Sequence, residues 1–469
     1  MATTDIRNEE VSKNNRKNDD HDDEDEYLCL VEFSHKHLDF LLPELISVLE
    51  MNGIGILNNN HDNTDAQAST TTLEDKNDTQ KWRTMCRIIP LPNERSYQQE
   101  TKAAPRRPFL ILAFSSDYYW KRKRRQKAIQ DLTNETQEAT NKNDNTATND
   151  DNDNHEDPDI ATVLSRCVLV RRVIELWGKP GTTIEETAHN TRQWIHGKNS
   201  NDGGELKDQQ SVSKQQQKGT IGKSIFEKAC DPSQSWKITI HTLGSKFTRQ
   251  EQNTMRANFA FLDLPGPVQM KNFTHEFLLI RETELDPTGS PLYPRHGHLG
   301  KGNIIPEHDA RLPLACYFGR ILVTRETLEQ YHLKRRAYLG PTSMDSELSF
   351  IMTNLGHLQK SSVVLDPFVG TGSILVSCAL RGAYCVGTDI DIRVLRGRSK
   401  DENVYSNFAQ FQLPRPELIR SDNAIYHRHF RNAEPWVDAI ITDPPYGKIV
   451  TILHYFVLYV LPFVLFVSY

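Results

Sequence analysis

The chain has 469 residues, of which 37% are hydrophobic and 25% are charged. That apolar fraction is low for a uniformly folded protein, and the deficit lies in four segments with almost no apolar periodicity. We expect a disordered acidic tail at 1–26 and three loop insertions at 57–80, 126–158 and 197–219. Such segments bury too little surface to offset their ordering entropy.

The charges favour a polyanionic partner. The formal net charge is -6, but the four polar segments hold a large share of the 62 Asp and Glu residues and few of the 56 Lys and Arg residues. The rest of the chain is therefore net positive, as expected of a protein that binds a polyanion.

The seven cysteines form no CxxC pair and show no histidine spacing suited to zinc. We expect reduced, buried thiols in a cytosolic or nuclear protein, and no metal site. The N-terminal residues contain no apolar run of the secretory type, so we expect no secretory signal.

The first folded part is expected to be a small α+β module. Apolar runs predict strands at 27–33 and 108–114, and helical spacing predicts helices at 37–51 and 160–177. A second module begins near Trp236, where alternation predicts a half-buried strand. Further strand candidates lie at 259–264, 276–280 and 315–323.

From Gly340 the pattern changes to that of a doubly wound α/β fold. A helix with a capping box at 342–345 is expected first. The segments that follow alternate strand, glycine turn, helix and strand, which begins a parallel sheet. The expected elements are a strand at 362–366, a helix at 374–380 and strands at 383–389, 417–421 and 438–442.

A glycine-rich turn follows the first of these strands, in the run Asp366-Pro-Phe-Val-Gly370-Thr-Gly372. Glycines there let the backbone approach a nucleotide-like ligand closely, although a glycine turn without a ligand is an equally good reading. Asp389 ends the next strand at the spacing expected for a carboxylate that accepts both ribose hydroxyls. Asp391 is the better candidate for the helix cap.

Asp422, after the third strand, is a weaker candidate for contact with an adenine amino group, since turns after strands often carry Asp-Asn. The strongest signal is Asp443-Pro444-Pro445-Tyr446, which ends the fourth strand. A carboxylate and a rigidly held carbonyl can accept both hydrogens of an exocyclic amine, so that its lone pair points at an electrophilic methyl group. An aromatic ring stacks on the base.

The full set of motifs resembles the catalytic subunit of the eukaryotic tRNA guanosine-10 N2-methyltransferases. It comprises YLGPTSMDSELSFIMTN, DPFVGTGS, GAYCVGTDID and DAIITDPPYG, and upstream HLDFLLPELISVLE, CVLVRRVIELWG, SWKITIHTLG and YFGR. The resemblance spans roughly 27–447, apart from the insertions.

The resemblance implies methylation of the guanine 2-amino group at position 10 of tRNA by S-adenosylmethionine, in the cytoplasm. It implies a ferredoxin-like module within 27–180, a THUMP RNA-binding domain within 181–330 and a Rossmann-like methyltransferase domain at 338–448. It also implies tRNA and a small zinc-binding activator subunit as partners. The implied cofactor residues are Thr342, Ser343, Met344, Asp366, Phe368, Gly370, Gly372, Asp389 and Asp422, and the implied catalytic residues are Asp443, Pro444 and Tyr446.

Other basic and histidine-containing segments have two readings each. The run 121–125 is either a nuclear-localisation signal or tRNA contact, or a solvated helix end. Residues 334–336 either neutralise tRNA phosphates or form an exposed linker. Histidines 296, 298 and 308 fit a polar loop better than a metal site.

After Gly447 the family pattern stops, and 449–469 is apolar and uncharged. We expect an incomplete sheet of four strands, with a tail foreign to the active protein; a membrane anchor or a buried replacement strand pair is less favoured. Two rival functions therefore remain: an adenine-N6 methyltransferase, and a tRNA-binding protein without catalytic activity.

Overall fold

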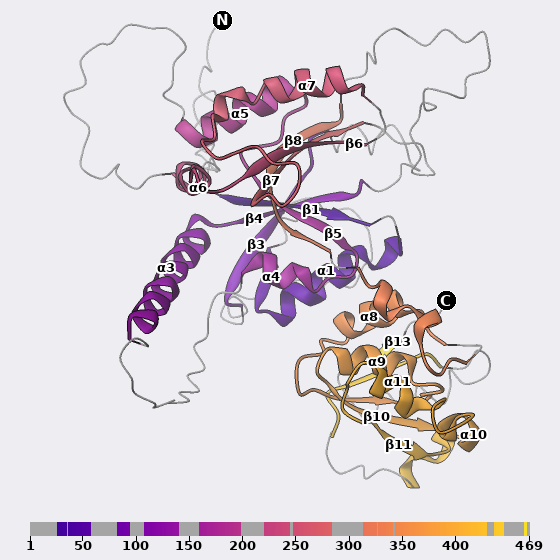
Figure 1. Ribbon diagram of the computed structural model, residues 1–469. Coiled ribbons are helices and arrows are strands. Elements are labelled where there is room, and N and C mark those ends of the chain that lie inside the picture. Colours follow the sequence, from indigo (N-terminus) through magenta and orange to yellow (C-terminus); the bar gives the residue numbers. More distant parts are fainter. Residues whose placement is uncertain are drawn as a thin grey trace, which may run out of the picture.

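The computed structural model describes residues 26–34, 36–57, 82–93, 107–139, 159–197, 220–243, 247–283, 313–325, 327–340, 343–428, 436–444 and 464–466. These residues form two bodies, each built on its own sheet, which meet at α1 and α8 (Figure 1). The α/β class is confirmed, with one mixed sheet and one parallel sheet.

The N-terminal body is an eight-stranded mixed sheet in the order β2-β3-β4-β1-β5-β8-β7-β6. Its strands are β1 Tyr27–Phe33, β2 Ile54–Leu57, β3 Thr84–Ile89, β4 Phe109–Phe114, β5 Val170–Leu176, β6 Trp236–Leu243, β7 His275–Glu282 and β8 Ala315–Thr324. The antiparallel pairing of β5 with β8 joins strands from both expected α+β modules into one sheet. The limits of those modules therefore stay predictions.

Helices cover both faces of this sheet. They are α1 Leu41–Met51, α3 Ser116–Ala139, α4 Ile160–Ser165, α5 Ile184–His196, α6 Ile221–Ala229 and α7 Arg249–Ala257. In Figure 1, α1 and α4 lie on the side of the C-terminal body, and α5 and α7 lie at the far end. Short 3₁₀ turns occur at Leu38–Phe40, Ala260–Leu262, Glu329–Tyr331 and Leu333–Arg335.

The C-terminal body is a parallel sheet in the order β11-β10-β9-β12-β13. Its strands are β9 Val363–Asp366, β10 Tyr384–Asp389, β11 Glu417–Arg420, β12 Ala439–Thr442 and β13 Val464–Phe466. Its helices are α8 Ser346–Leu355, α9 Ser373–Leu380, α10 Ile392–Arg396 and α11 Val404–Gln410, with a 3₁₀ segment at Asn423–Arg428. The predicted strand-helix-strand order is confirmed.

Two predicted elements of the N-terminal body are wrong. The expected helix at 160–177 ends at Ser165 in α4, and its second half is the strand β5, buried at the centre of the sheet. The apolar residues of β5, Val173, Ile174 and Leu176, continue the apolar spacing of α4, and periodicity alone cannot tell a short buried strand from a helix segment. The expected strand at 259–264 is instead a 3₁₀ turn at Ala260–Leu262.

The insertions differ in outcome. Helix α3 runs past Gln126 to Ala139, so that part of the 126–158 insertion is helical, contrary to the prediction. Glu26, Leu57 and Gly197 are described at the edges of the other three segments, and the remaining residues of all four lie outside the described part of the chain. Helix α8 is capped by Asp345, which accepts the N–H groups of Glu347 and Leu348 at 2.9 and 3.3 Å, so the predicted capping box is wrong.

The apolar tail contributes one strand that was not predicted. β13 pairs in parallel with β12, with Val464 opposite Ile440. The other residues after Pro444 lie outside the described part. Among the residues that are described, no helix is both long and apolar enough to cross a membrane.

Buried thiols are confirmed, since all the cysteines are free and every one but the half-buried Cys230 is buried.

Candidate functional site

The glycine turn joins β9 to α9 at the carboxyl edge of the parallel sheet. Gly370 and Gly372 have φ values of 51° and 79°, in the left-handed region that favours glycine. A Cβ atom on Gly372 would lie 2.8 Å from Cγ1 of Val404 on α11. The turn therefore requires glycine at Gly372 both for its backbone angle and for its close packing.

The Asp389 carboxylate fixes this turn from the neighbouring strand. Its Oδ2 accepts the Gly370 N–H at 3.0 Å, and its Oδ1 accepts the Asp391 N–H at 2.9 Å. Asp391 caps α10, as predicted, by accepting the Arg393 N–H at 2.9 Å. Asp389 thus belongs to the loop framework, and it also faces a cavity.

That cavity has a volume of about 740 Å³ and lies over the ends of β9, β10, β11 and β12. Parallel strands end at the same edge of a sheet, which brings the four aspartates that end or follow them to one place. The predicted site residues that line it are Ser343, Met344, Asp366, Phe368, Gly370, Asp389, Asp422, Asp443 and Pro444. Gly372 shapes the turn without lining the cavity, and Thr342 and Tyr446 lie outside the described residues.

Asp366 is a buried carboxyl group at the base of the cavity. Its Oδ1 accepts the Phe368 N–H at 3.0 Å and the Thr442 hydroxyl at 2.7 Å. Burial raises the pKa of Asp366 to about 7, with smaller contributions from the negative charges of Asp389 and Asp443, although the two hydrogen bonds lower it. A bound cation would favour its ionised form.

Asp443 and Pro444 are half-buried at the end of β12 and face the same cavity. Burial raises the pKa of the Asp443 carboxyl group. A carboxylate oxygen next to a fixed carbonyl can accept both hydrogens of an amine, which is the geometry that the predicted chemistry requires.

The sequence did not single out several other residues of the cavity. Asn423 donates from Nδ2 to the Pro367 carbonyl, and its Oδ1 accepts the Thr388 hydroxyl at 3.3 Å. The Ser343 and Thr371 hydroxyls lie 2.9 Å apart and connect the segment before α8 to the glycine turn. The Asp-Asn run at 422–423 was a signal for Asn423, whereas the Ser343–Thr371 contact depends on tertiary structure alone.

The position of Arg336 contradicts the prediction for residues 334–336. Its side chain is buried, with 7% of the residue exposed, and burial lowers its pKa to about 10. It can therefore neither contact tRNA phosphates nor lie in an exposed linker; the neighbouring Lys334 and Arg335 are exposed. Histidines 296, 298 and 308 lie outside the described residues.

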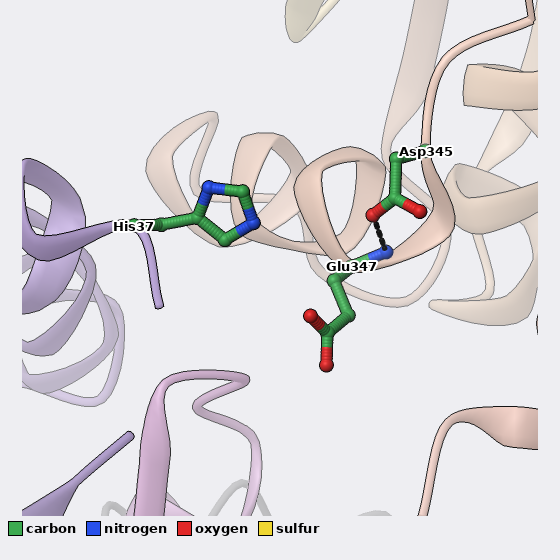
Figure 2. A group of neighbouring side chains, drawn as sticks. All are labelled: His37, Asp345 and Glu347. Carbon is green, nitrogen blue, oxygen red and sulfur yellow. Dashed lines mark hydrogen bonds between the residues drawn. The ribbon is translucent and has the colours of Figure 1, made fainter. Parts of the chain in front are cut away.

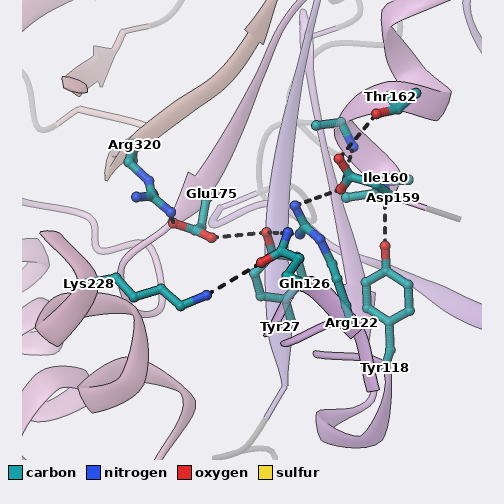
Figure 3. Close-up of polar contacts among 11 residues, drawn as sticks. Tyr27, Tyr118, Arg122, Gln126, Asp159, Ile160, Thr162, Glu175, Lys228 and Arg320 are labelled. Atoms are coloured by element: carbon teal, nitrogen blue, oxygen red, sulfur yellow. Dashed lines mark hydrogen bonds and ion pairs between the residues drawn. The ribbon is translucent and has the colours of Figure 1, made fainter. Parts of the chain in front are cut away.

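Basic side chains lie on the N-terminal body where α3 approaches α6, and Figure 3 shows one of them, Lys228, directed toward Gln126. The Lys123 Nζ donates to the Ser224 hydroxyl at 2.5 Å, and the Lys228 Nζ donates to the Gln126 side-chain oxygen at 3.5 Å. Neither ammonium group has a carboxylate partner among the described residues. Burial, and then the positive charges of Lys123 and two arginines, lower the pKa of Lys228.

The predicted basic run at 121–125 lies on α3, so it is a helix segment, and part of it is engaged within the protein. Arg122 forms an ion pair with Asp159 at 2.6 Å and donates to the Tyr27 hydroxyl at 3.2 Å (Figure 3). We define the α3–α6 basic face as Lys123, Arg124, Lys127, Lys223 and Lys228.

One group of side chains has the spacing of a metal site, at the contact of the two bodies. Ligand atoms of His37, Asp345 and Glu347 lie within 4.8 Å of one another (Figure 2). Asp345 caps α8, and Glu347 forms ion pairs with Lys36 at 3.0 Å and Arg325 at 2.5 Å. These partners already neutralise the carboxylate that a cation would need.

Comparisons with known proteins relate this chain to methyltransferases. Residues 334–452 match the family model of an RMKL-like methyltransferase domain. The chain is 37% identical over 226 residues to the human tRNA (guanine(10)-N(2))-methyltransferase TRMT11, covering 45% of this chain and 44% of that protein. It is 32% identical over 213 residues to the tRNA (guanine(10)-N(2))-methyltransferase of Schizosaccharomyces pombe, covering 45% and 40%.

The resemblance predicted from the motifs is thereby confirmed, although the chain spans less than half the length of these curated relatives. Among solved structures, TrmN from Thermus thermophilus is 14% identical, with a TM-score of 0.28, over 68% of this chain and 76% of that one.

Proposed function

We propose that this chain is the catalytic part of a tRNA methyltransferase that moves a methyl group from S-adenosylmethionine to the 2-amino group of guanosine 10. The observation that carries the proposal is one cavity: Asp443 and Pro444 line it together with Asp389 and the glycine turn. An amine-accepting turn and a nucleoside-binding turn therefore face the same space.

The lining of the cavity fits S-adenosylmethionine. Four aspartates surround a space of about 740 Å³, which suits a ligand with a sulfonium and an ammonium cation. Asp389 would accept the ribose hydroxyls, and Asp422 would accept the adenine amino group. Ser343, Met344, Phe368 and Gly370 would complete the pocket, with Gly372 shaping its turn and Thr342 assigned by resemblance.

When bound, S-adenosylmethionine supplies an electrophilic methyl group. The protein then has to orient the guanine amine, whose lone pair is delocalised into the ring. Asp443 and the Pro444 carbonyl would accept its two hydrogens and direct the lone pair away from them. As the new C–N bond forms, the bond between the methyl carbon and the sulfonium sulfur would break and leave a neutral thioether. The nitrogen becomes positive and releases one proton, for which the Asp443 carboxylate is the nearest proposed acceptor. Tyr446 would stack on the base.

The proposed substrate is a polyanion, and the α3–α6 basic face supports this choice. Its ammonium groups lack carboxylate partners among the described residues, so a phosphate backbone can neutralise them. We assign RNA binding to the N-terminal body, with a ferredoxin-like module and a THUMP domain as its two parts, and S-adenosylmethionine binding to a Rossmann-like domain. The small activator subunit and a cytoplasmic location are retained as predictions.

The test is methyl transfer from labelled S-adenosylmethionine to transcribed tRNA, followed by digestion and identification of the labelled nucleoside. N2-methylguanosine, lost when guanosine 10 is replaced by adenosine, is the expected result. N6-methyladenosine would establish the adenine rival instead. Binding of tRNA without binding of S-adenosylmethionine, measured by calorimetry, would establish the non-catalytic rival.

A further inference from the structure

Helix α8 is shared between the two bodies. Leu348, Phe350 and Ile351 on this helix belong to the hydrophobic core of the N-terminal body. Met352, the next residue, belongs to the core of the C-terminal body. The helix packs against α1 on one side and α9 on the other, as Figure 1 shows. The bodies are therefore joined through a packed helix as well as through the chain.

A polar cluster lies buried at the centre of this joint. Glu44 of α1 and Asn354 of α8 both have 0% exposed surface. The Asn354 Nδ2 donates to Glu44 Oε1 at 2.7 Å. The same carboxylate accepts the N–H groups of Val168 and Leu169, both at 2.8 Å. The Glu44 carboxylate thus connects α1, the segment before β5, and α8.

Arg166 engages the remaining positions of the Asn354 amide. The Arg166 Nε donates to Asn354 Oδ1 at 2.9 Å, and the Arg166 carbonyl accepts Asn354 Nδ2 at 3.2 Å. Arg381, which follows α9, donates to that carbonyl at 3.0 Å. The side-chain amide of Asn354 therefore has partners for its oxygen and for both of its hydrogens, all contributed by the N-terminal body.

The hydrogen bonds of the cluster can all form in only one relative position of the two bodies. Apolar side chains tolerate small sliding movements, because their contacts have no direction. A buried amide and carboxylate do not, since a shift of about 1 Å leaves donors and acceptors unpaired in a low-dielectric interior. Burial raises the pKa of Glu44 and lowers that of Arg166 to about 10, as expected for groups removed from water.

We infer that Glu44, Asn354 and Arg166 are positioning residues that lock the RNA-binding body to the methyl-transfer cavity and thereby determine which nucleotide of a bound RNA enters it. The inference rests on the proposed function. The N-terminal body would hold the RNA at one place, and the cavity lies in the other body. A fixed orientation of the two bodies therefore fixes the distance along the RNA between the bound part and the nucleotide that reaches the cavity.

The first experiment measures the distance between the two bodies and needs no methyl transfer. Dyes are attached at Gln250→Cys on α7 and Ala409→Cys on α11, both exposed, in a Cys230→Ser background; the other cysteines are buried. Single-molecule energy transfer in the full chain then reports the distance between the bodies. We expect one narrow distribution, and a broader one in Asn354→Ala and in Glu44→Gln.

Two further variants make this test specific. Asn354→Asp places a second carboxylate against Glu44 and should broaden the distribution. Adding Glu44→Gln to this variant restores a hydrogen-bond donor and acceptor between positions 44 and 354, so the distance distribution should become narrow again. Two changes that merely destabilise the protein would not produce this rescue. Lys36→Ala, which removes an exposed ion pair of Glu347 at the rim of the same joint, is the control and should leave the distribution unchanged. A narrow distribution in Asn354→Ala would overturn the inference.

The second experiment measures selectivity on tRNA. In the wild-type chain, where the Glu44–Asn354–Arg166 cluster is intact, labelled N2-methylguanosine should come from one position of the tRNA, as mapped in digested fragments. In Asn354→Ala we expect kcat/KM at that position to fall about tenfold or more, because misplacement by about 1 Å can cost about 100-fold. Label should also spread to neighbouring guanosines, whereas partial unfolding would lower the yield without spreading it.

The two proposals fail separately. A wild-type chain that transfers no methyl group contradicts the proposed function, while the energy-transfer result still decides whether the lock exists. A wild-type chain that methylates one guanosine, together with an Asn354→Ala variant of equal selectivity, contradicts the lock alone.

Discussion

The Thr442 hydroxyl donates to the Asp366 carboxylate at 2.7 Å, which ties the last residue of β12 to the last residue of β9. Both residues are buried, and each precedes one half of the proposed site: Asp366 begins the glycine turn, and Thr442 precedes Asp443. This hydrogen bond adds to the parallel pairing of β9 with β12, and together they fix the spacing between the glycine turn and the proposed amine-accepting turn.

Replacing Asp389 should weaken binding of S-adenosylmethionine. Asp389→Ala removes the proposed ribose acceptor and the carboxylate that holds Gly370 at 3.0 Å. Hydrogen bonds to charged groups contribute about 1.5–3 kcal/mol, so we expect a loss of roughly 10- to 100-fold in affinity by calorimetry. Asp391→Asn, which retains a helix-capping oxygen outside the cavity, should bind normally. Equal affinity in Asp389→Ala would remove Asp389 from the site.

The stability of the ligand-free protein should fall as pH rises toward 7. The pKa of Asp366 is raised to about 7 by burial, above about 3.9 in the unfolded chain. Its stabilising contribution is therefore complete below about pH 4 and is lost as pH rises through 7, at up to about 1.4 kcal/mol per pH unit. Asp366→Asn should flatten the profile of Tm against pH between 5 and 7; parallel profiles would contradict the assignment.

The same group predicts the pH dependence of ligand binding. Ionised Asp366 attracts the cationic ligand, so affinity for S-adenosylmethionine should increase from pH 6 to pH 8, with uptake of the ligand releasing a proton. Calorimetry in buffers of different ionisation enthalpy measures that proton. Asp366→Asn should show neither effect.

Gly372→Ala should destabilise the C-terminal body. A left-handed conformation costs a residue with a Cβ atom about 1–2 kcal/mol, and here that Cβ atom also lies 2.8 Å from Val404. The control is Gly370→Ala in the same turn, where φ is 51° and a Cβ atom would meet only the Phe368 carbonyl oxygen, at 4.0 Å. Thermal unfolding should show the larger loss for Gly372→Ala. Equal losses of thermal stability in the two variants would mean that Val404 on α11 moves aside without an energetic cost.

The α3–α6 basic face should contribute to tRNA affinity. Lys123→Ala with Lys228→Ala should weaken binding and lower the slope of log K against log salt by about 0.9 for each phosphate that the variant no longer neutralises. Lys360→Ala, an exposed lysine of the C-terminal body, is the control. An unchanged slope in the double variant would mean that other residues bind the phosphates.

The sequence predicted the C-terminal body better than the N-terminal one. β9, β10 and β12 are short, mostly apolar runs that end in Asp or directly before Asp443, so their ends and their parallel order follow from local signals. The four aspartates could therefore be assigned to one sheet edge. The Thr442–Asp366 hydrogen bond could not, because it joins residues far apart in the sequence.

The N-terminal sheet was harder to predict for two physical reasons. β2 has only four residues and pairs with β3 across the 57–80 segment, which leaves little local pattern. In β5 every residue from Val173 to Leu176 is buried, including Glu175, so this part of the strand shows no alternation of buried and exposed positions. The joint at Glu44 and Asn354 has no signature in sequence, since it depends on two helices of different bodies meeting.

The most direct test of the central claim is single-turnover methyl transfer to tRNA by Asp443→Ala, with binding of S-adenosylmethionine measured on the same sample. We expect ligand binding close to wild type and transfer reduced about 100-fold or more, as when a group aligned with the reacting atoms is removed. Asp391→Asn should transfer normally. Transfer by Asp443→Ala at the wild-type rate would contradict the proposed role of this turn.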